Sequence, residues 1–79
     1  MDPQAAWDQL IEAYTRRDWS AVEELAEGLL HWLSRGGFPP RTVPRLSMDR
    51  GWNLAVAESA CRFSLSRVRA DQQEEVTDD

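Results

Sequence analysis

Residues 18–40 read DWSAVEELAEGLLHWLSRGGFPP and contain one complete helix with its start and stop signals. Either Asp18 or Ser20 can cap the N-terminus, since both side chains accept hydrogen bonds from the first helical N–H groups. The Gly-Gly pair favours a left-handed stop, and the Pro-Pro pair after it prevents the helix from continuing. We therefore expect a helix over residues 19–35, whose apolar side chains recur at helical spacing: Val22, Leu25, Ala26, Leu29, Leu30, Trp32 and Leu33.

Another helix is expected directly before it, over residues 3–17. Asp2 can cap this helix, and Pro3 suits its first turn. An apolar face then follows at the spacing i, i+3, i+4 and i+7: Trp7, Leu10, Ile11 and Tyr14. Because so few residues separate the two helices, we expect them to form an antiparallel hairpin.

A third helix is expected over residues 48–70, beginning near Ser47 or Asp49. At ~100° per residue its apolar side chains fall on two nearly opposite sides. One side holds Trp52, Val56, Ala60 and Phe63, and the other holds Leu54, Ala57, Cys61, Leu65 and Val68. The hairpin can cover one side, so the other needs the preceding loop, the start of the tail or another molecule.

Residues 36 to about 47 form a loop rich in proline and glycine. A loop of this length is either functional or held down by the packing of Phe38, Val43 and Leu46. Residues 71–79 contain five acidic residues and one apolar residue, so we expect an acidic tail that is frayed or disordered.

These elements predict an all-α fold: one three-helix domain over residues 1–70, with the hairpin crossed by the third helix. A domain of 79 residues has a thin stability margin. Its single cysteine cannot form an internal disulfide, so association with another chain is the natural way to add stability.

Charge is segregated along the chain into three blocks. Residues 1–27 contain seven acids and two arginines, residues 28–70 contain seven arginines and two acids, and residues 71–79 contain only acids. The blocks carry −5, +5 and −5, which gives the net charge of −5. An acidic hairpin and a basic region could therefore pair head to tail between subunits, whereas a shared third-helix face would give a two-fold dimer.

No residue pattern predicts catalysis, and no cofactor, metal ion or small molecule is expected. His31 and Cys61 alone cannot build a metal site, and Cys61 lies on an apolar helix face that favours packing over nucleophilic chemistry. Arginines near the loop suit phosphate, but the acidic pI of about 4.7 argues against nucleic-acid binding. The chain shows neither a signal peptide nor an apolar run long enough for a membrane span, so we expect a cytoplasmic protein.

Residues 5–33 resemble a single tetratricopeptide-type helix–turn–helix. The family pattern Trp-x-x-Leu-x-x-x-Tyr is matched by Trp7, Leu10 and Tyr14, and Asp18-Trp19 matches the start of its second helix. The turn is one residue shorter, Ile11 replaces a small residue, and no second repeat follows. The resemblance covers about a third of the chain and implies hairpin geometry and partner binding.

We therefore expect a non-catalytic protein–protein interaction module that self-assembles or docks on a protein partner. The predicted contact residues are Leu54, Cys61, Leu65, Val68 and Trp32, with charged contacts from Arg41, Arg45, Arg50, Arg62 and Arg69. The alternative is a small acidic inhibitor, of phage or plasmid type, that occupies a nucleic-acid-binding protein.

Overall fold

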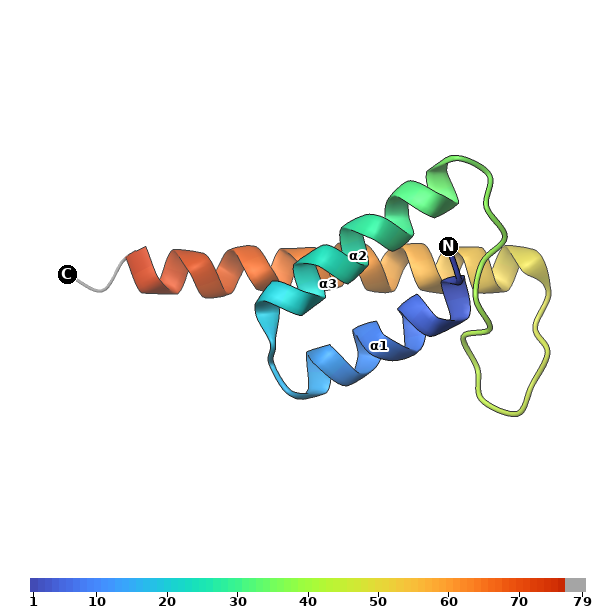
Figure 1. Ribbon diagram of the computed structural model, residues 1–79, viewed down its shortest axis with the longest axis horizontal. Coiled ribbons are helices and arrows are strands. Elements are labelled where there is room, and N and C mark those ends of the chain that lie inside the picture. The colour runs from blue at the N-terminus through green and yellow to red at the C-terminus, as the bar shows by residue number, and fades with distance from the viewer. Residues whose placement is uncertain (77–79) are drawn as a thin grey trace.

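Three α-helices make up the fold, as the sequence predicts. The computed structural model describes residues 1–76, with side chains through Gln72. Its helices are α1 (Pro3–Thr15), α2 (Trp19–Ser34) and α3 (Arg50–Val76), and a loop over residues 35–49 joins the last two. Helices α1 and α2 form an antiparallel hairpin, and α3 crosses it (Figure 1). The all-α prediction of a hairpin with a third helix packed across it is confirmed.

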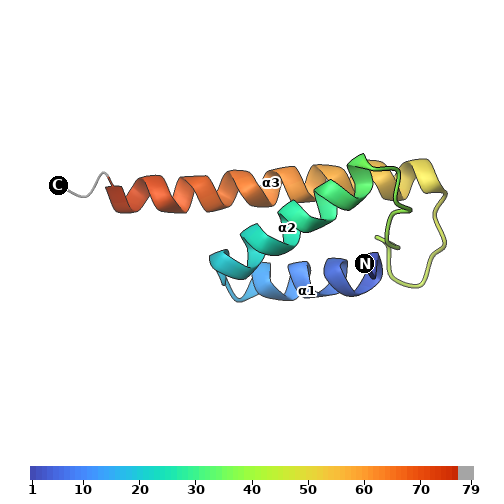
Figure 2. The same cartoon turned by 45° about the horizontal axis from the view of Figure 1, so that its top comes forward.

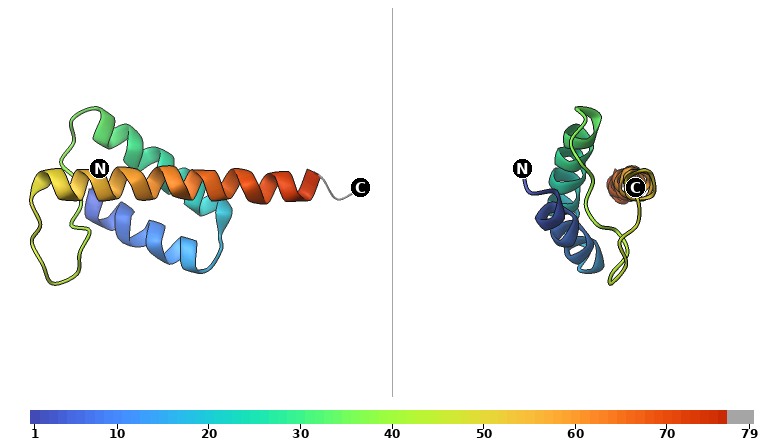
Figure 3. Two further views of the ribbon diagram at one scale, coloured as in Figure 1. Left: turned by 180° about the vertical axis from the view of Figure 1, so that it is seen from behind. Right: turned by 90° about the vertical axis from the view of Figure 1, so that its right-hand side faces the viewer.

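Helix α2 occupies the middle of the molecule. Figure 2 shows α1 on one side of α2 and α3 on the other, and the end-on view of Figure 3 shows α3 lying against the hairpin layer. The side chains of Val22, Ala26 and Leu29 on α2 are completely buried. The core that surrounds them draws on all three helices: Trp7, Leu10, Ala13, Leu33, Ala57, Cys61 and Val68.

An aspartate begins each helix. Asp2 Oδ1 accepts hydrogen bonds from the backbone N–H groups of Gln4 and Ala5, each at 3.1 Å. Asp18 Oδ1 accepts from Ala21 N at 3.3 Å. Asp18 is therefore the cap of α2 rather than Ser20, and Trp19 lies inside the helix. Before α3, Asp49 Oδ1 accepts from Trp52 N at 2.8 Å.

Both hairpin helices end in the same hydrogen-bonded motif, one with glycine and one without. After α2, Gly36 has φ +84°, and Gly37 N donates to Trp32 O at 3.0 Å. After α1, Arg17 takes the left-handed position with φ +57°, and Asp18 N donates to Ala13 O at 3.0 Å. Helix α1 thus ends two residues before the expected boundary, since Arg17 must leave the helical region to make this turn.

Arg17→Gly should therefore stabilise the protein. A left-handed conformation costs a non-glycine residue about 1–2 kcal/mol, which exceeds the roughly 0.5–1 kcal/mol that glycine loses through chain entropy. We expect the melting temperature to rise by roughly 2–4 °C, measured by circular dichroism. Gly36→Ala, at the equivalent turn, is the matched control and should lower it. A decrease with Arg17→Gly would contradict this explanation of the turn.

Helix α3 is longer than the sequence suggested. It begins at Arg50 and continues through Val76, so residues 71–76 are helical, whereas we expected them in the tail; residues 77–79 lie outside the described residues. Its 27 residues span about 40 Å, against about 24 Å for α2. No described side chain beyond Val68 is buried. The last turns of α3 therefore project past the hairpin (Figures 1 and 3).

Candidate protein-binding surface

Side-chain amides hold the loop between α2 and α3 in place. The Gln4 amide makes two hydrogen bonds with the Arg41 backbone, accepting from its N–H at 2.8 Å and donating to its carbonyl at 3.2 Å. Asn53 on α3 accepts from the backbone N and side-chain Oγ1 of Thr42, at 3.2 and 2.8 Å. Its Nδ2 group donates to Met48 O at 3.1 Å. These amides tie the loop to the start of α1 and to α3.

Tryptophan 32 anchors the beginning of the same loop. Trp32 Nε1 donates to Phe38 O at 2.9 Å, and the two rings meet edge to face with centroids 5.9 Å apart. Any side chain at Gly37 would overlap the Trp32 ring. Phe38 and Leu46 are nevertheless more than half exposed. Of the three side chains named for the packing alternative, only Val43 is partly buried, and hydrogen bonds to the loop backbone hold the loop as well.

Asn53→Ala should loosen the loop and destabilise the fold. The substitution leaves the part-buried Thr42 and Met48 groups without their partner, which costs about 1–3 kcal/mol. The expected result is a lower melting temperature and faster hydrogen exchange at the Thr42 amide. Gln4→Ala removes an exposed amide and should cost less. Equal, negligible losses in both variants would show that these amides do not anchor the loop.

The side of α3 that we predicted as an interface instead faces α2. Cys61 and Val68 lie in the core, and Leu54 and Leu65 are partly buried against it. The prediction is therefore wrong for Cys61 and Val68, which cannot reach a partner in the folded chain. Trp32 is partly buried by its loop contacts. Small side chains explain the preference of α2 for this side of α3, since they let two helices approach closely: Ala57, Cys61 and Ser64.

Burial also makes the Cys61 thiol unreactive. The Cys61 side chain has no exposed surface. Desolvation raises its pKa to about 11; the Arg62 guanidinium lowers this pKa and the Glu58 carboxylate raises it, both by smaller amounts. The thiol is protonated at neutral pH, whereas the nucleophilic form of cysteine is the thiolate.

A thiol reagent such as Ellman's reagent should therefore react with Cys61 only when the protein unfolds. At pH 8 the native chain should label at least ten times more slowly than the chain in denaturant. A native rate equal to the denatured rate would mean that the α2–α3 interface is open. Ser20→Cys, at an exposed α2 position, provides the control for an accessible thiol.

Large apolar side chains are exposed on the side of α3 that turns away from α2. Phe63 is 59% exposed and Trp52 is 49% exposed, while Ile11 on α1 is 46% exposed. Phe63 lies beside Tyr14, with ring centroids 6.2 Å apart. We call Ile11, Trp52 and Phe63 the aromatic surface. The helical spacing in the sequence places Trp52 and Phe63 together on one side of this helix, but the predicted interface is on the opposite side.

An apolar groove runs between α1 and α3 beside the aromatic surface. It has a volume of about 230 Å³ and is lined by Trp7, Leu10, Ile11, Tyr14, Thr15, Ala60, Phe63 and Ser64. A second hollow of about 610 Å³ adjoins it between α1 and loop residues 41–45, and the two share Trp7 and Ile11. Figure 2 shows α1 and α3 each lying along α2, and the groove lies between α1 and α3 where their side chains leave space.

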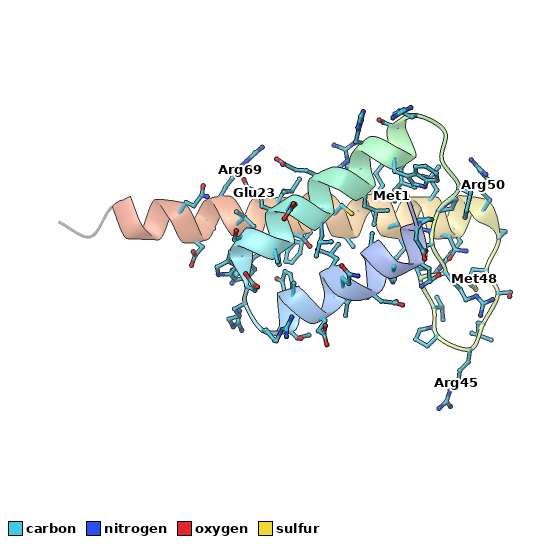
Figure 4. All side chains as sticks on the ribbon, viewed as in Figure 1. Met1, Glu23, Arg45, Met48, Arg50 and Arg69 are labelled. Atoms are coloured by element: carbon cyan, nitrogen blue, oxygen red, sulfur yellow. The ribbon has the colours of Figure 1, made fainter. Side chains whose placement is uncertain are left out.

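The predicted charged contacts divide into two groups. Arg41 and Arg45 line the larger hollow, and Figure 4 shows Arg45 at the outer tip of the loop and Arg50 near the start of α3. Arg50 Nη2 donates to Gly36 O at 3.3 Å. Farther along α3, Arg62 pairs with Glu58 at 3.7 Å, and Arg69 is exposed. The five arginines therefore do not form one patch.

One arginine that we did not predict lies above an aromatic ring. The Arg67 guanidinium sits 5.8 Å from the centre of the Trp19 ring. This contact joins α3 to the start of α2. Arg67 is four residues from Phe63 on the same helix, so its positive charge lies at the edge of the aromatic surface.

Comparison with known protein families, with curated proteins and with solved structures found no match to this chain. The likeness of residues 5–33 to a tetratricopeptide-type hairpin stays a prediction. Among the side chains that the structure describes, no three His, Cys, Asp or Glu residues are close enough together to hold a metal ion. None of the helices within residues 1–76 is both long and apolar enough to cross a membrane.

Proposed function

We propose that this chain is a non-catalytic protein–protein interaction module whose contact surface is the aromatic surface and the adjoining groove. The observation that carries the proposal is the exposure of Ile11, Trp52 and Phe63 on the side that α2 leaves uncovered. Ile11 and Phe63 line the same apolar groove, and exposed apolar surface marks binding sites on small proteins.

The energetics favour a partner at this surface. Burying a large apolar side chain contributes about 1.5–3 kcal/mol, and these three retain roughly half of that potential in the free chain. Aromatic side chains also dominate the binding energy of known interfaces. Because the chain has no internal disulfide, the same burial adds stability that a domain of this size otherwise lacks.

The shape of the site suits a helix. A groove between two helices, lined by apolar side chains, accepts the apolar face of an amphipathic helix. Such a helix would lie across Phe63 and Ile11 and fill the space that α1 and α3 leave open. The proposal thus keeps the function expected from the sequence and moves its contact residues to the other side of α3.

The binding experiment described below also tests the alternative of an acidic inhibitor. It would use exposed carboxylates of the hairpin, such as Glu24 and Glu27, rather than the aromatic surface. The cytoplasmic location expected from the sequence also remains a prediction.

Phe63→Asp tests the proposal, because it places a charge in the contact surface without changing the core. We expect the variant to bind at least ten times more weakly to the protein that the wild-type chain retains from an extract of its own cells. The same loss is expected if the retained protein is a second copy of this chain. Phe38→Asp is the matched control, since Phe38 is also a phenylalanine and is 60% exposed, on the loop. Circular dichroism checks that both variants fold.

If Phe63→Asp and Phe38→Asp both bind the partner as strongly as the wild-type chain does, the aromatic surface is not the binding site. Loss of binding in a variant that neutralises Glu24 and Glu27, with Phe63→Asp unaffected, would favour the acidic inhibitor.

A further inference from the structure

We propose that the partner is a second copy of this chain, with the two α3 helices packed antiparallel across a two-fold axis near Phe63. This inference rests on the proposed function and specifies what covers the aromatic surface. Three features of α3 carry it: an uncharged outward face, opposite charges at its two ends, and a C-terminal part that projects past the hairpin.

The outward face of α3 carries no charge along most of its length. At ~100° per residue, six of the positions in residues 50–72 fall within an arc of about 80° centred away from α2: Trp52, Ala55, Ser59, Phe63, Ser66 and Ala70. The first five are exposed, and Arg62 and Arg67 lie outside the arc. A helix face turned to solvent usually carries charged residues. This face instead offers two aromatic side chains with small residues between them, over which a second helix can lie closely.

Charge determines which way the second helix runs. The loop end of the molecule carries four arginines over residues 35–50, against one acid, Asp49. The opposite end of α3 carries Asp71, Glu74 and Glu75. Figure 4 shows Arg45 and Arg50 at one end of a molecule 48 Å long, and α3 runs towards the other. Antiparallel packing brings these oppositely charged ends together, whereas parallel packing would place like charges side by side.

The projecting part of α3 fits the same arrangement. If the two-fold axis passes near Phe63, the position opposite Val76 is Arg50 of the second copy. The turns beyond Val68, which no helix covers in the single chain, then lie along the start of the other α3. Each copy uses the same face, so the assembly closes as a dimer rather than growing into a filament.

Light scattering with size-exclusion chromatography gives the first test, on the purified full chain over a range of concentrations. The expected mass is twice the chain's 9.1 kDa, and the dimer should weaken at high salt because opposite charges contribute to it. Phe63→Asp should shift the dissociation constant at least tenfold, and the control Phe38→Asp should leave it within about twofold.

A distance measurement gives the second test. A nitroxide on Gln72→Cys reports the separation between copies by pulsed electron paramagnetic resonance, while buried Cys61 stays unlabelled. Because residue 72 is nine residues from the axis on each copy, the two labels are offset by about 27 Å along the helices in the antiparallel dimer; a parallel dimer has no such offset and gives a markedly shorter distance.

The outcomes separate this inference from the proposed function. A chain that stays monomeric at every concentration, but still captures another protein through Phe63, overturns the dimer and leaves the interaction module standing. A label distance shorter than about 27 Å, or a mass that grows beyond the dimer, also overturns the arrangement. A monomer whose Phe63→Asp variant retains every partner overturns both proposals.

Discussion

The burial of α2 on two sides is the constraint on which the rest of the structure depends. Val22, Ala26 and Leu29 have no exposed surface, because α1 covers one side of their helix and α3 the other. A chain this short has enough apolar side chains to bury only one helix on two sides. Once α2 takes that place, α1 and α3 both pack mainly against it and contact each other only in part. The open groove between them follows directly from this arrangement.

The loop completes the fold at one end of that groove. Its hydrogen bonds to Gln4, Trp32 and Asn53 fix this segment together with the burial of Pro40. Because its backbone is held by side chains of all three helices, its large residues need not turn inward. Phe38 and Arg45 therefore remain on the surface, and the arginines gather at the end of the molecule opposite the projecting part of α3.

Much of the fold was predictable from local signals, and the binding surface was not. Aspartates before each helix and Gly36 after α2 act within a few residues, so the sequence alone indicates them. The end of α1 was not predictable from the sequence, because arginine has no preference for the left-handed conformation that Arg17 adopts there. The two apolar sides of α3 look equivalent in sequence. Only the packing of α2, which approaches closely over Ala57 and Cys61, decides which side becomes core.

The four tryptophans allow the most direct test of the aromatic surface as an association site, through their indole N–H signals in nitrogen–proton NMR spectra. Trp52 lies on that surface, Trp7 is buried in the core, and the Trp32 indole is hydrogen-bonded within the loop. On raising the protein concentration, we expect the Trp52 signal to shift or broaden while that of Trp32, outside the aromatic surface and the groove, stays fixed. A stationary Trp52 signal beside a moving Trp32 signal would contradict this expectation.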